Sequence, residues 1–239
     1  MKLHQGLIAA GLLAVFGPGS IGAQEQVGAS ILVRTHIVDR NRLDQYEGLM
    51  AERMEELRAS GEGFRHVFEQ VRGQQETYLV ITPYDGPIFA ASTNWVNAIN
   101  NVVLSSVLVT QQAYTDAFTV ELGEDVSVPG AFMYTRVRTV LPDRNDDYYA
   151  WQRDELIPAL READVGDIRT LRVVHGGNIN TWIRYSYIDE IPIIGAPDPV
   201  VGAIGDRRAQ ELFATGNAMT MSASDFIYRY RPDLSYDTD

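Results

Sequence analysis

Arginines on predicted β-strands are the residues of this chain best suited to bind a charged small molecule. Arg34 and Arg138 lie 104 residues apart in matching Val-Arg-Thr tripeptides, and Arg136 shares a strand face with Arg138. Guanidinium groups bind carboxylates and phosphates through paired hydrogen bonds. If the opposite strand face packs on helices, these groups point between two sheets, where an unpaired charge is costly. We therefore predict a ligand site of Arg34, Arg136 and Arg138, with Tyr78 and Arg184 from later strands.

A structural role for the same arginines is the alternative, and it is the more common arrangement in proteins. Glu69 or Glu76 could pair with them, or the guanidinium groups could lie exposed at strand ends. Structural ion pairs perturb charged groups just as binding sites do. Both interpretations stay open at the level of the sequence.

Histidine and tryptophan supply the candidates for catalysis. His36 is the best placed general base because it shares a strand face with Arg34. His66 is expected about 10 Å away, two strand spacings, which is too far for a shared metal ion. No histidine or acidic metal-binding motif occurs, so we predict no metal site and no cofactor. Trp95 and Trp182 complete the catalytic candidates, with plain core packing as the alternative for each.

Two copies of one unit of about 104 residues carry these side chains. Asp39-Arg40-Asn41 recurs as Asp143-Arg144-Asn145, at the same offset as the Val-Arg-Thr match, and Tyr78 corresponds to Trp182. In the helix after these motifs, the offset between the two copies changes by one residue, which pairs Tyr46 with Tyr149. The repetition predicts two structurally similar halves.

Each unit has the pattern strand, helix, strand, strand, helix, strand. In the first unit, alternating residues 31–38 predict a strand, and a helix begins after Asn41 and ends at the glycines of 61–63. Hairpin strands are predicted at 64–71 and 77–84, and at 168–174 and 181–187. Asn94 and Asp198 are predicted to begin the second helices, and the last strands are placed at 118–122 and 226–230. Pro158 is expected to kink or shorten its helix.

The βαββαβ order is the ferredoxin-like split βαβ plan. Two such units in tandem resemble the dimeric α+β barrel superfamily, which includes antibiotic-biosynthesis monooxygenases, haem-degrading monooxygenases and NIPSNAP-like proteins. The resemblance covers nearly all of residues 30–232. It implies an α+β fold in which two four-stranded sheets face each other, with both halves supplied by one chain. Haem-degrading members use a histidine on the second helix, and residues 94–114 and 198–216 contain none.

The ends of the chain differ from the repeated units. Residues 1–23 have the pattern of a secretory signal, with Lys2 before an apolar run and a small-residue cleavage region ending at Ala23. We therefore expect export to the periplasm or the medium, and no membrane-spanning segment in the mature chain. The units are placed at 24–128 and 129–232, followed by an acidic tail, 233–239.

Composition excludes several classes of function. The net charge of −12 argues against nucleic acid as a partner. The absence of cysteine excludes thiol catalysis, and the loss of Lys2 with the signal excludes a lysine nucleophile.

Three functions remain under these limits. The first is binding of a small aromatic or anionic molecule between the two sheets. The second is a cofactor-independent monooxygenase-like activity. The third is an assembly module that uses the apolar loops 86–93 and 190–197. A monomer and a homodimer are both compatible with the sequence.

Overall fold

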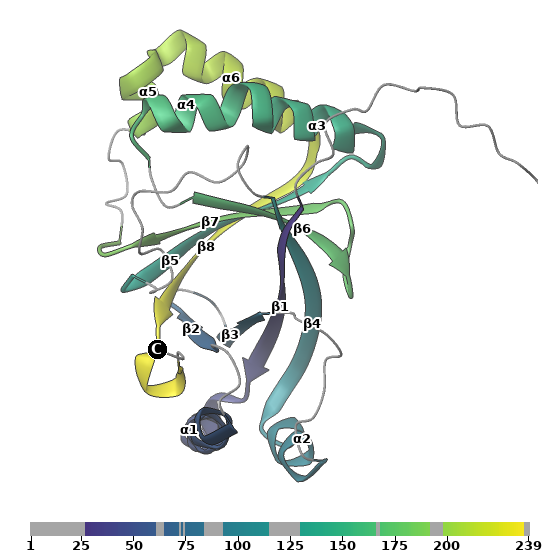
Figure 1. Ribbon diagram of the computed structural model, residues 1–239, viewed down its shortest axis with the longest axis vertical. Helices are drawn as coiled ribbons and strands as arrows, with labels where there is room; N and C mark the ends of the chain where they lie inside the picture. The colour runs from purple at the N-terminus through teal and green to yellow at the C-terminus, as the bar shows by residue number, and fades with distance from the viewer. Residues whose placement is uncertain are drawn as a thin grey trace, which may run out of the picture.

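Eight antiparallel strands close into a barrel in the computed structural model, which describes residues 27–60, 65–71, 73, 75–83, 93–114, 130–165, 168–191 and 198–236. The strand order is β1-β3-β2-β8-β5-β7-β6-β4. Helices cover the barrel on two opposite sides, with α1 and α2 on one side and α3 to α6 on the other (Figure 1). This arrangement confirms the predicted α+β fold class with two halves in one chain.

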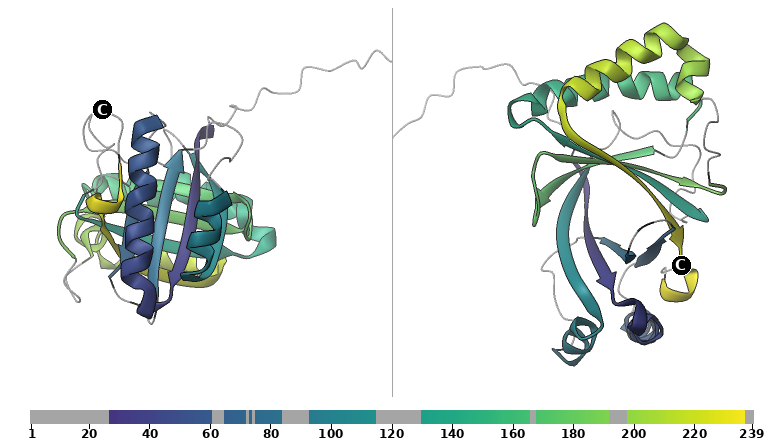
Figure 2. Two further views of the ribbon diagram at one scale, coloured as in Figure 1. Left: turned by 90° about the horizontal axis from the view of Figure 1, so that it is seen from below. Right: turned by 180° about the vertical axis from the view of Figure 1, so that it is seen from behind.

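The first half contains four strands and two helices. Its elements are β1 (Val27–Val38), α1 (Leu43–Ser60), β2 (His66–Gln70), β3 (Glu76–Pro83), α2 (Thr93–Asn100) and β4 (Val103–Tyr114). Helices α1 and α2 cross the outer face of this half-sheet (Figure 2). The predicted first strand, first helix and hairpin are therefore confirmed to within a few residues.

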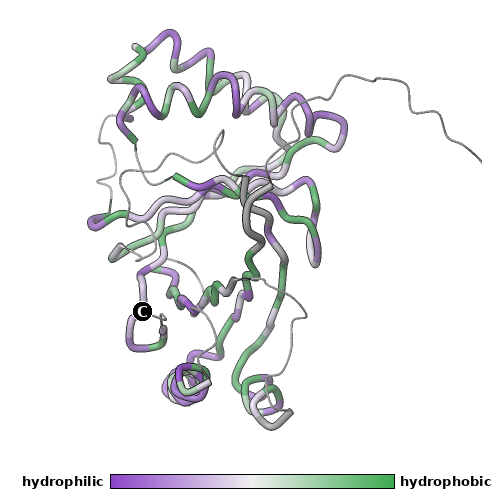
Figure 3. The backbone as a smooth tube through the Cα atoms, in the orientation of Figure 1, coloured by the Kyte–Doolittle hydropathy of each residue, from purple (hydrophilic) through white to green (hydrophobic). Residues whose placement is uncertain are grey.

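The second half repeats the plan with a longer helical layer. Its elements are β5 (Phe132–Val140), α3 (Asn145–Trp151), a π-helical segment (Gln152–Leu156), α4 (Ile157–Glu162), β6 (Ile168–His175), β7 (Thr181–Ile188), α5 (Pro199–Ile204), α6 (Asp206–Ala218) and β8 (Thr220–Tyr230). The Asp198 side chain accepts a hydrogen bond from the Val200 backbone N–H, as predicted for a capping residue. Hydrophobic and hydrophilic residues alternate along the helices of this layer (Figure 3).

The predicted position of the first unit's last strand was wrong. The fourth strand of the first half is β4, Val103–Tyr114, whereas the prediction placed it at 118–122, outside the described residues. The prediction aligned Phe118 with Phe226, but in the barrel Val109 and Phe226 both pack inside. The second half inserts α6 before β8, and this insertion displaced the sequence alignment. The signal region, the boundary between residues 128 and 129 and most of both apolar loops also lie outside the described residues.

Most strands are buried or half-buried on both faces, although residues 104–107 of β4 and 221–225 of β8 are exposed. Between the half-sheets lies a cluster of buried residues: Val33, Phe68, Leu79, Ile81, Met133, Leu171, Tyr185 and Tyr228. Two further clusters lie under the helices, one around Tyr46 and Tyr78 in the first half and one around Tyr148 and Trp182 in the second. The helices therefore contribute their own cores outside the barrel.

The halves are interlocked at two seams. Strand β8 of the second half pairs with β2, and β4 of the first half pairs with β6. Beyond β8, the chain packs Leu234 and Tyr236 into the core under α1. The Val67 backbone N–H donates to Ser235 Oγ, 2.8 Å away. The segment that follows β8 thus completes the core of the first half.

Strand register aligns the two halves differently from the sequence motifs. Arg34 lies opposite Val80, and Arg136 lies opposite Arg184, although Val80 and Arg184 are 104 residues apart. The first strands therefore superimpose at an offset of 102, so Arg34 corresponds to Arg136 rather than to Arg138. At this offset His36 corresponds to Arg138. The alignment based on sequence motifs was therefore displaced by two residues. Because side chains alternate between the faces of a strand every two residues, this displacement left each residue on the same face.

The π-helical segment accounts for the change of offset along the first helix. Tyr46 and Tyr148 both pack under the helix layer at an offset of 102, whereas Leu57 and Leu160 do so at 103. A π turn inserts one residue into an α-helix. Here the Ile157 backbone N–H donates to Gln152 O, just before Pro158. Pro158 therefore does not end the helix, which continues as α4 directly after the π turn.

No described helix meets the length and hydropathy needed to cross a bilayer.

Candidate functional site

The predicted arginines lie on the helix-facing side of their sheets. His36, on the same face of β1 as Arg34, has its Nδ1 2.9 Å from the Tyr46 hydroxyl of α1. Arg138 lies opposite Trp182, which packs against Tyr148 of α3. The prediction that these guanidinium groups point between the two sheets was therefore wrong. Because most strands are buried or half-buried on both faces, alternation alone did not identify the barrel face.

Aromatic side chains fill the space between the sheets instead. Phe68 stacks on Tyr187 with ring centroids 6.0 Å apart, and Tyr230 contacts both Phe68 and His66. Burial raises the pKa of Tyr228 to about 12. This region is a packed core in the described part of the chain, and it is not where the arginines gather.

Three strands place Arg136, Arg184 and Thr170 side by side on the helix-facing side of the second half. Arg184 lies directly opposite Arg136 on β5 and opposite Thr170 on β6. Side chains opposite each other in this way have their Cβ atoms about 5 Å apart. The three residues therefore form one polar row across the sheet.

The same row in the first half is almost entirely apolar. Arg34 lies opposite Val80, and Val80 lies opposite Val67. Val67 and Val80 are buried in the core under α1. Where the first half has two valines, the second half has Thr170 and Arg184. Such a replacement in a helix-covered layer costs stability unless the new groups bind something.

The helix that covers the row also has a polar residue in the second half where the first half has an apolar one. In the first half, Met50 on the inner side of α1 belongs to the core between this helix and the sheet. The offset of 102 places Gln152 at the equivalent position of the second half. Gln152 is 1% exposed and begins the π-helical segment. Its Nε2, like Thr170 Oγ1, is buried with no hydrogen-bond partner in the described chain. A buried polar group left unbonded costs about 1–3 kcal/mol.

Positive charge in this layer exceeds negative charge. Asp225 on β8 is bonded by Arg138 Nη1 at 2.8 Å and by the Tyr134 hydroxyl at 3.0 Å. Arg136 Nε donates to the Tyr134 hydroxyl at 3.2 Å, and its guanidinium lies over the Tyr134 ring. Arg184 makes no hydrogen bond or ion pair to any described residue. Three guanidinium groups therefore share one carboxylate.

Titration of the neighbouring groups reflects this imbalance. Burial, and then the adjacent charge of Arg136, lower the pKa of Arg184 to about 10. Burial raises the pKa of Tyr148, while the charges of Arg184 and Arg138 act in the opposite direction. Hydrogen bonds from Arg138 and Tyr134 outweigh burial and hold the pKa of Asp225 below its usual value. The hydroxyl of Tyr148 therefore lies in the field of two arginines.

We call this group the polar cluster: Arg136, Arg138, Tyr148, Gln152, Thr170, Arg184 and Asp225. Arg136, Arg138 and Arg184 were predicted from the sequence. Tyr148, Gln152, Thr170 and Asp225 were missed. A comparison of the two repeats in the register of the sheet, rather than by motif matches, would have found Gln152 and Thr170.

The other predicted site residues lie apart from the polar cluster or have structural roles. Arg34 is in the first half, where burial lowers its pKa. Trp95 Nε1 donates to the backbone carbonyl of Leu49 at 3.2 Å. Trp182 lies next to the polar cluster, but its Nε1 donates to Asn145 at 3.1 Å. His36 and Trp95 therefore do not form one site with Trp182.

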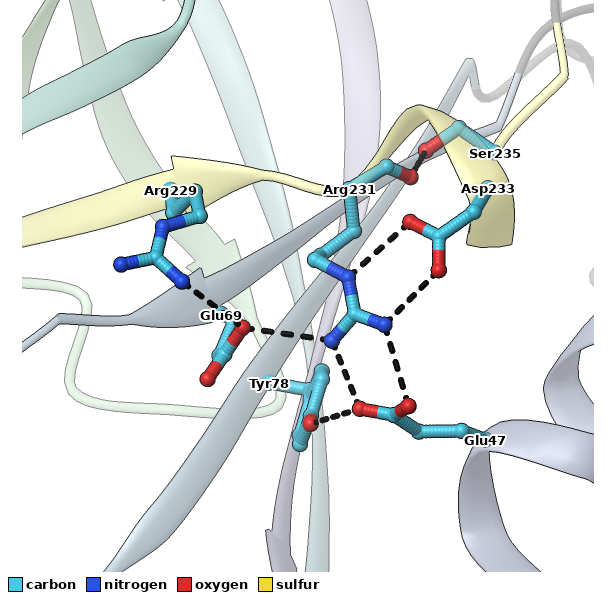
Figure 4. Close-up of polar contacts among 7 residues, drawn as sticks. All are labelled: Glu47, Glu69, Tyr78, Arg229, Arg231, Asp233 and Ser235. Atoms are coloured by element: carbon cyan, nitrogen blue, oxygen red, sulfur yellow. Dashed lines mark hydrogen bonds and ion pairs between the residues drawn. The ribbon is translucent and has the colours of Figure 1, made fainter. Parts of the chain in front are cut away.

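Tyr78 belongs to an ion-pair network that joins the two halves, which we call the Arg231 clasp: Glu47, Glu69, Tyr78, Arg231 and Asp233 (Figure 4). Arg231 bonds both oxygens of Glu47, at 2.6 and 3.0 Å, and reaches Glu69 and Asp233. The Tyr78 hydroxyl donates to Glu47 at 2.7 Å.

The carboxylates considered as structural partners of the predicted arginines bind other residues. Glu69 pairs with Arg231 and Arg229, and Glu76 pairs with Arg40. Neither forms an ion pair with Arg34 or Arg138 in the described chain. No three described histidine or acidic residues are placed to hold a metal ion.

Known structures share this architecture across most of the chain. A candidate monooxygenase of Fusobacterium nucleatum has 13% identity and a TM-score of 0.57 over 87% of this chain and 98% of its own. The chain has the dimeric α+β barrel fold. A candidate monooxygenase of Lactobacillus acidophilus (10% identity, TM-score 0.54, 88% and 97% covered) and an anthrone oxidase-like protein (14%, 0.55, 88% and 93%) share this barrel. No family model and no curated protein matches the sequence. At sequence identities this low, the similarity to these structures shows a shared fold and does not establish a function.

Proposed function

We propose that the protein binds a small anionic molecule at the polar cluster, between the α3 layer and the second half-sheet. The observation that carries this proposal is the pair Arg136 and Arg184, which lie directly opposite each other and bind no carboxylate in the described chain. Like charges in such a pair repel, and partial burial strengthens the repulsion. An anion between the two guanidinium groups relieves it.

The surroundings of the pair support a ligand rather than a structural ion pair. Thr170 and Gln152 add two buried groups that can donate hydrogen bonds and have no partner among the described residues. The equivalent positions of the first half are apolar, so the fold itself does not require polar residues there. Groups that are costly to the fold and gathered in one place are typical of binding sites.

Thermal denaturation in the presence of anions tests the proposal. Benzoate and phthalate, each titrated at constant ionic strength, should raise the Tm of the wild-type chain. A ligand at 100 times its Kd stabilises the folded state by about 2.7 kcal/mol. Arg184→Met should abolish the shift. Arg144→Met is the matched control, because Arg144 pairs with Asp147 on the exposed side of the helix layer. An equal shift in wild type and Arg184→Met would reject the proposal.

An oxidative activity is the second candidate, favoured by the two candidate monooxygenases that share the fold. Tyr148 beside Arg138 and Arg184 would be the group in contact with such a substrate. Oxygen consumption with quinol-like substrates tests this activity. Absence of turnover in the wild type would leave binding as the function.

We also propose that residues 1–23 direct export of the chain. The proposal is supported by the order of Lys2, the apolar run and the small residues before Gln24. The mass of the protein purified from its own source should correspond to a chain beginning at Gln24. A mass that includes Met1 and Lys2 would contradict it.

A further inference from the structure

The charge balance of the polar cluster specifies the charge of its ligand. Arg138 and Asp225 are 2.8 Å apart and neutralise each other. Arg136 has only the uncharged Tyr134 hydroxyl as a hydrogen-bond partner, and Arg184 has none in the described chain. Three guanidinium groups and one carboxylate therefore leave an excess of two positive charges in this cluster, in a chain whose net charge is −12.

The free polar groups next to these charges require acceptor atoms. A guanidinium group can only donate hydrogen bonds, and so can the amide nitrogen of Gln152. The Thr170 hydroxyl can donate as well and lies opposite Arg184. A ligand rich in oxygen acceptors satisfies all four residues, whereas an apolar or cationic ligand satisfies none.

One carboxylate cannot neutralise three guanidinium groups. Asp225 is 43% exposed and is bonded by Arg138, and its single charge also acts on Arg136 and Arg184 without forming an ion pair with either in the described chain. A ligand with one negative charge would leave one of two neighbouring guanidinium groups unpaired beside it. A ligand with two negative charges neutralises both.

This inference rests on the proposed function. We infer that the natural ligand is a small oxyanion with two negative charges, which are neutralised by Arg136 and Arg184. Two carboxylates on adjacent carbon atoms match guanidinium groups on directly opposite strand positions. A single-centre dianion such as sulfate matches them if both side chains converge on it.

The test compares benzoate and phthalate, which share a ring but differ in charge, with sulfate, an inorganic dianion. Affinities of benzoate, phthalate and sulfate are measured by titration calorimetry at pH 7.5 and constant ionic strength. Phthalate or sulfate should bind the wild-type chain at least tenfold more tightly than benzoate. A preference for phthalate over sulfate identifies a dicarboxylate, and the reverse preference identifies a single-centre oxyanion.

Variants that change the charge of the polar cluster should change the preferred ligand charge. Arg136→Met and Arg184→Met each leave one uncompensated guanidinium, so either variant should reduce the phthalate preference to less than threefold. Asp225→Asn frees Arg138 and keeps an acceptor for the Tyr134 hydroxyl. This variant should bind benzene-1,2,3-tricarboxylate at least tenfold more tightly than the wild type does.

The outcomes separate this inference from the proposed function. Equal affinities of benzoate and phthalate for the wild type, both lost in Arg184→Met, would overturn the double charge and leave anion binding intact. Binding of phthalate that is unchanged in both arginine variants would overturn the proposed function as well. Arg144→Met should behave as wild type in every titration.

Discussion

Arg136 of β5 and Arg184 of β7 lie directly opposite each other on the helix-facing side of the second half-sheet, and neither forms an ion pair in the described chain. Their counterparts in the first half are Arg34 and Val80. Where the first half has Val80, the second half thus has a second guanidinium group. The replacement makes the two halves chemically different although their strands have the same plan.

Arg184→Met should stabilise the ligand-free protein. It removes the repulsion between like charges, which is about 1 kcal/mol or less for a directly opposite pair. For a chain of this size, this corresponds to a Tm increase of up to about 4 °C. Differential scanning calorimetry in dilute buffer measures the change. A large decrease in Tm would show that Arg184 has an unidentified partner in the folded protein.

His36 should make stability depend on pH between 6.5 and 4. Burial and the charge of Arg34 lower the pKa of His36 from 6.5 to about 4. The folded protein therefore binds this proton less readily than the unfolded chain does. The neutral imidazole costs nothing above pH 6.5, and the folded state loses up to about 3 kcal/mol relative to the unfolded state as the pH falls to 4.

Urea denaturation at several pH values isolates the contribution of His36. The difference in unfolding free energy between wild type and His36→Phe should change by about 3 kcal/mol between pH 7 and pH 4, in favour of the variant at low pH. His175→Gln, in the exposed β6–β7 hairpin, is the control and should follow the wild type. A pH-independent difference for His36→Phe would contradict the buried, neutral state.

The plan of the fold could be predicted from the sequence, but the direction of the side chains could not. Alternating residues located β1, and the motif repeat predicted two similar halves. However, Val33 packs inside the barrel while His36 packs under a helix, and both faces are buried. Hydrophobicity therefore does not distinguish the barrel face from the helix face. The arginines were assigned to the wrong side for this reason.

The contacts between the halves were also beyond sequence-based prediction. The Arg231 clasp joins Arg231 to Glu47, which are 184 residues apart. No local pattern specifies such a pair. The repeats showed a one-residue slip at the first helix, interpreted as a change of offset from 104 to 103 that pairs Tyr46 with Tyr149. In the structure Tyr46 corresponds to Tyr148, and the π turn then inserts one residue near Gln152.

The Arg231 clasp should be lost in acid. Hydrogen bonds from Arg231 outweigh burial and lower the pKa of Glu47 below its ordinary 4.5, and the same arginine lowers that of Asp233. Both carboxylates thus release their protons more readily in the folded state. Their contribution is complete above about pH 4.5 and disappears as the pH falls through the lowered values.

Arg231→Met measures this contribution. It should cost about 2–3 kcal/mol at pH 7, because it removes charge-assisted hydrogen bonds to Glu47. In acid, as the pH falls through the lowered pKa values of Glu47 and Asp233, the wild type and the variant should differ by much less. Arg208→Met, which removes an exposed pair with Glu162, should have little effect at either pH. A cost that persists in acid would assign the effect to packing rather than charge.

Gly176 is required where the β6–β7 hairpin approaches β4. Its φ of +79° is in the region that favours glycine, and a Cβ there would overlap the Leu108 carbonyl oxygen. This carbonyl belongs to the strand that forms the β4–β6 seam, so the backbone at the seam would have to move. Gly176→Ala should therefore destabilise the fold by several kcal/mol, through both strain and steric overlap.

Gly202→Ala provides the matched control, because a Cβ at that position in α5 meets nothing within 4 Å. Alanine is the better helix former by about 1 kcal/mol, so this variant should be slightly more stable than the wild type. Chemical denaturation of both variants gives the comparison. Hydrogen exchange should show faster opening of β4 and β6 in Gly176→Ala, since these strands share the strained contact. Equal stability of the two variants would mean that the hairpin does not contact β4 closely at Gly176. The barrel would then close without this contact.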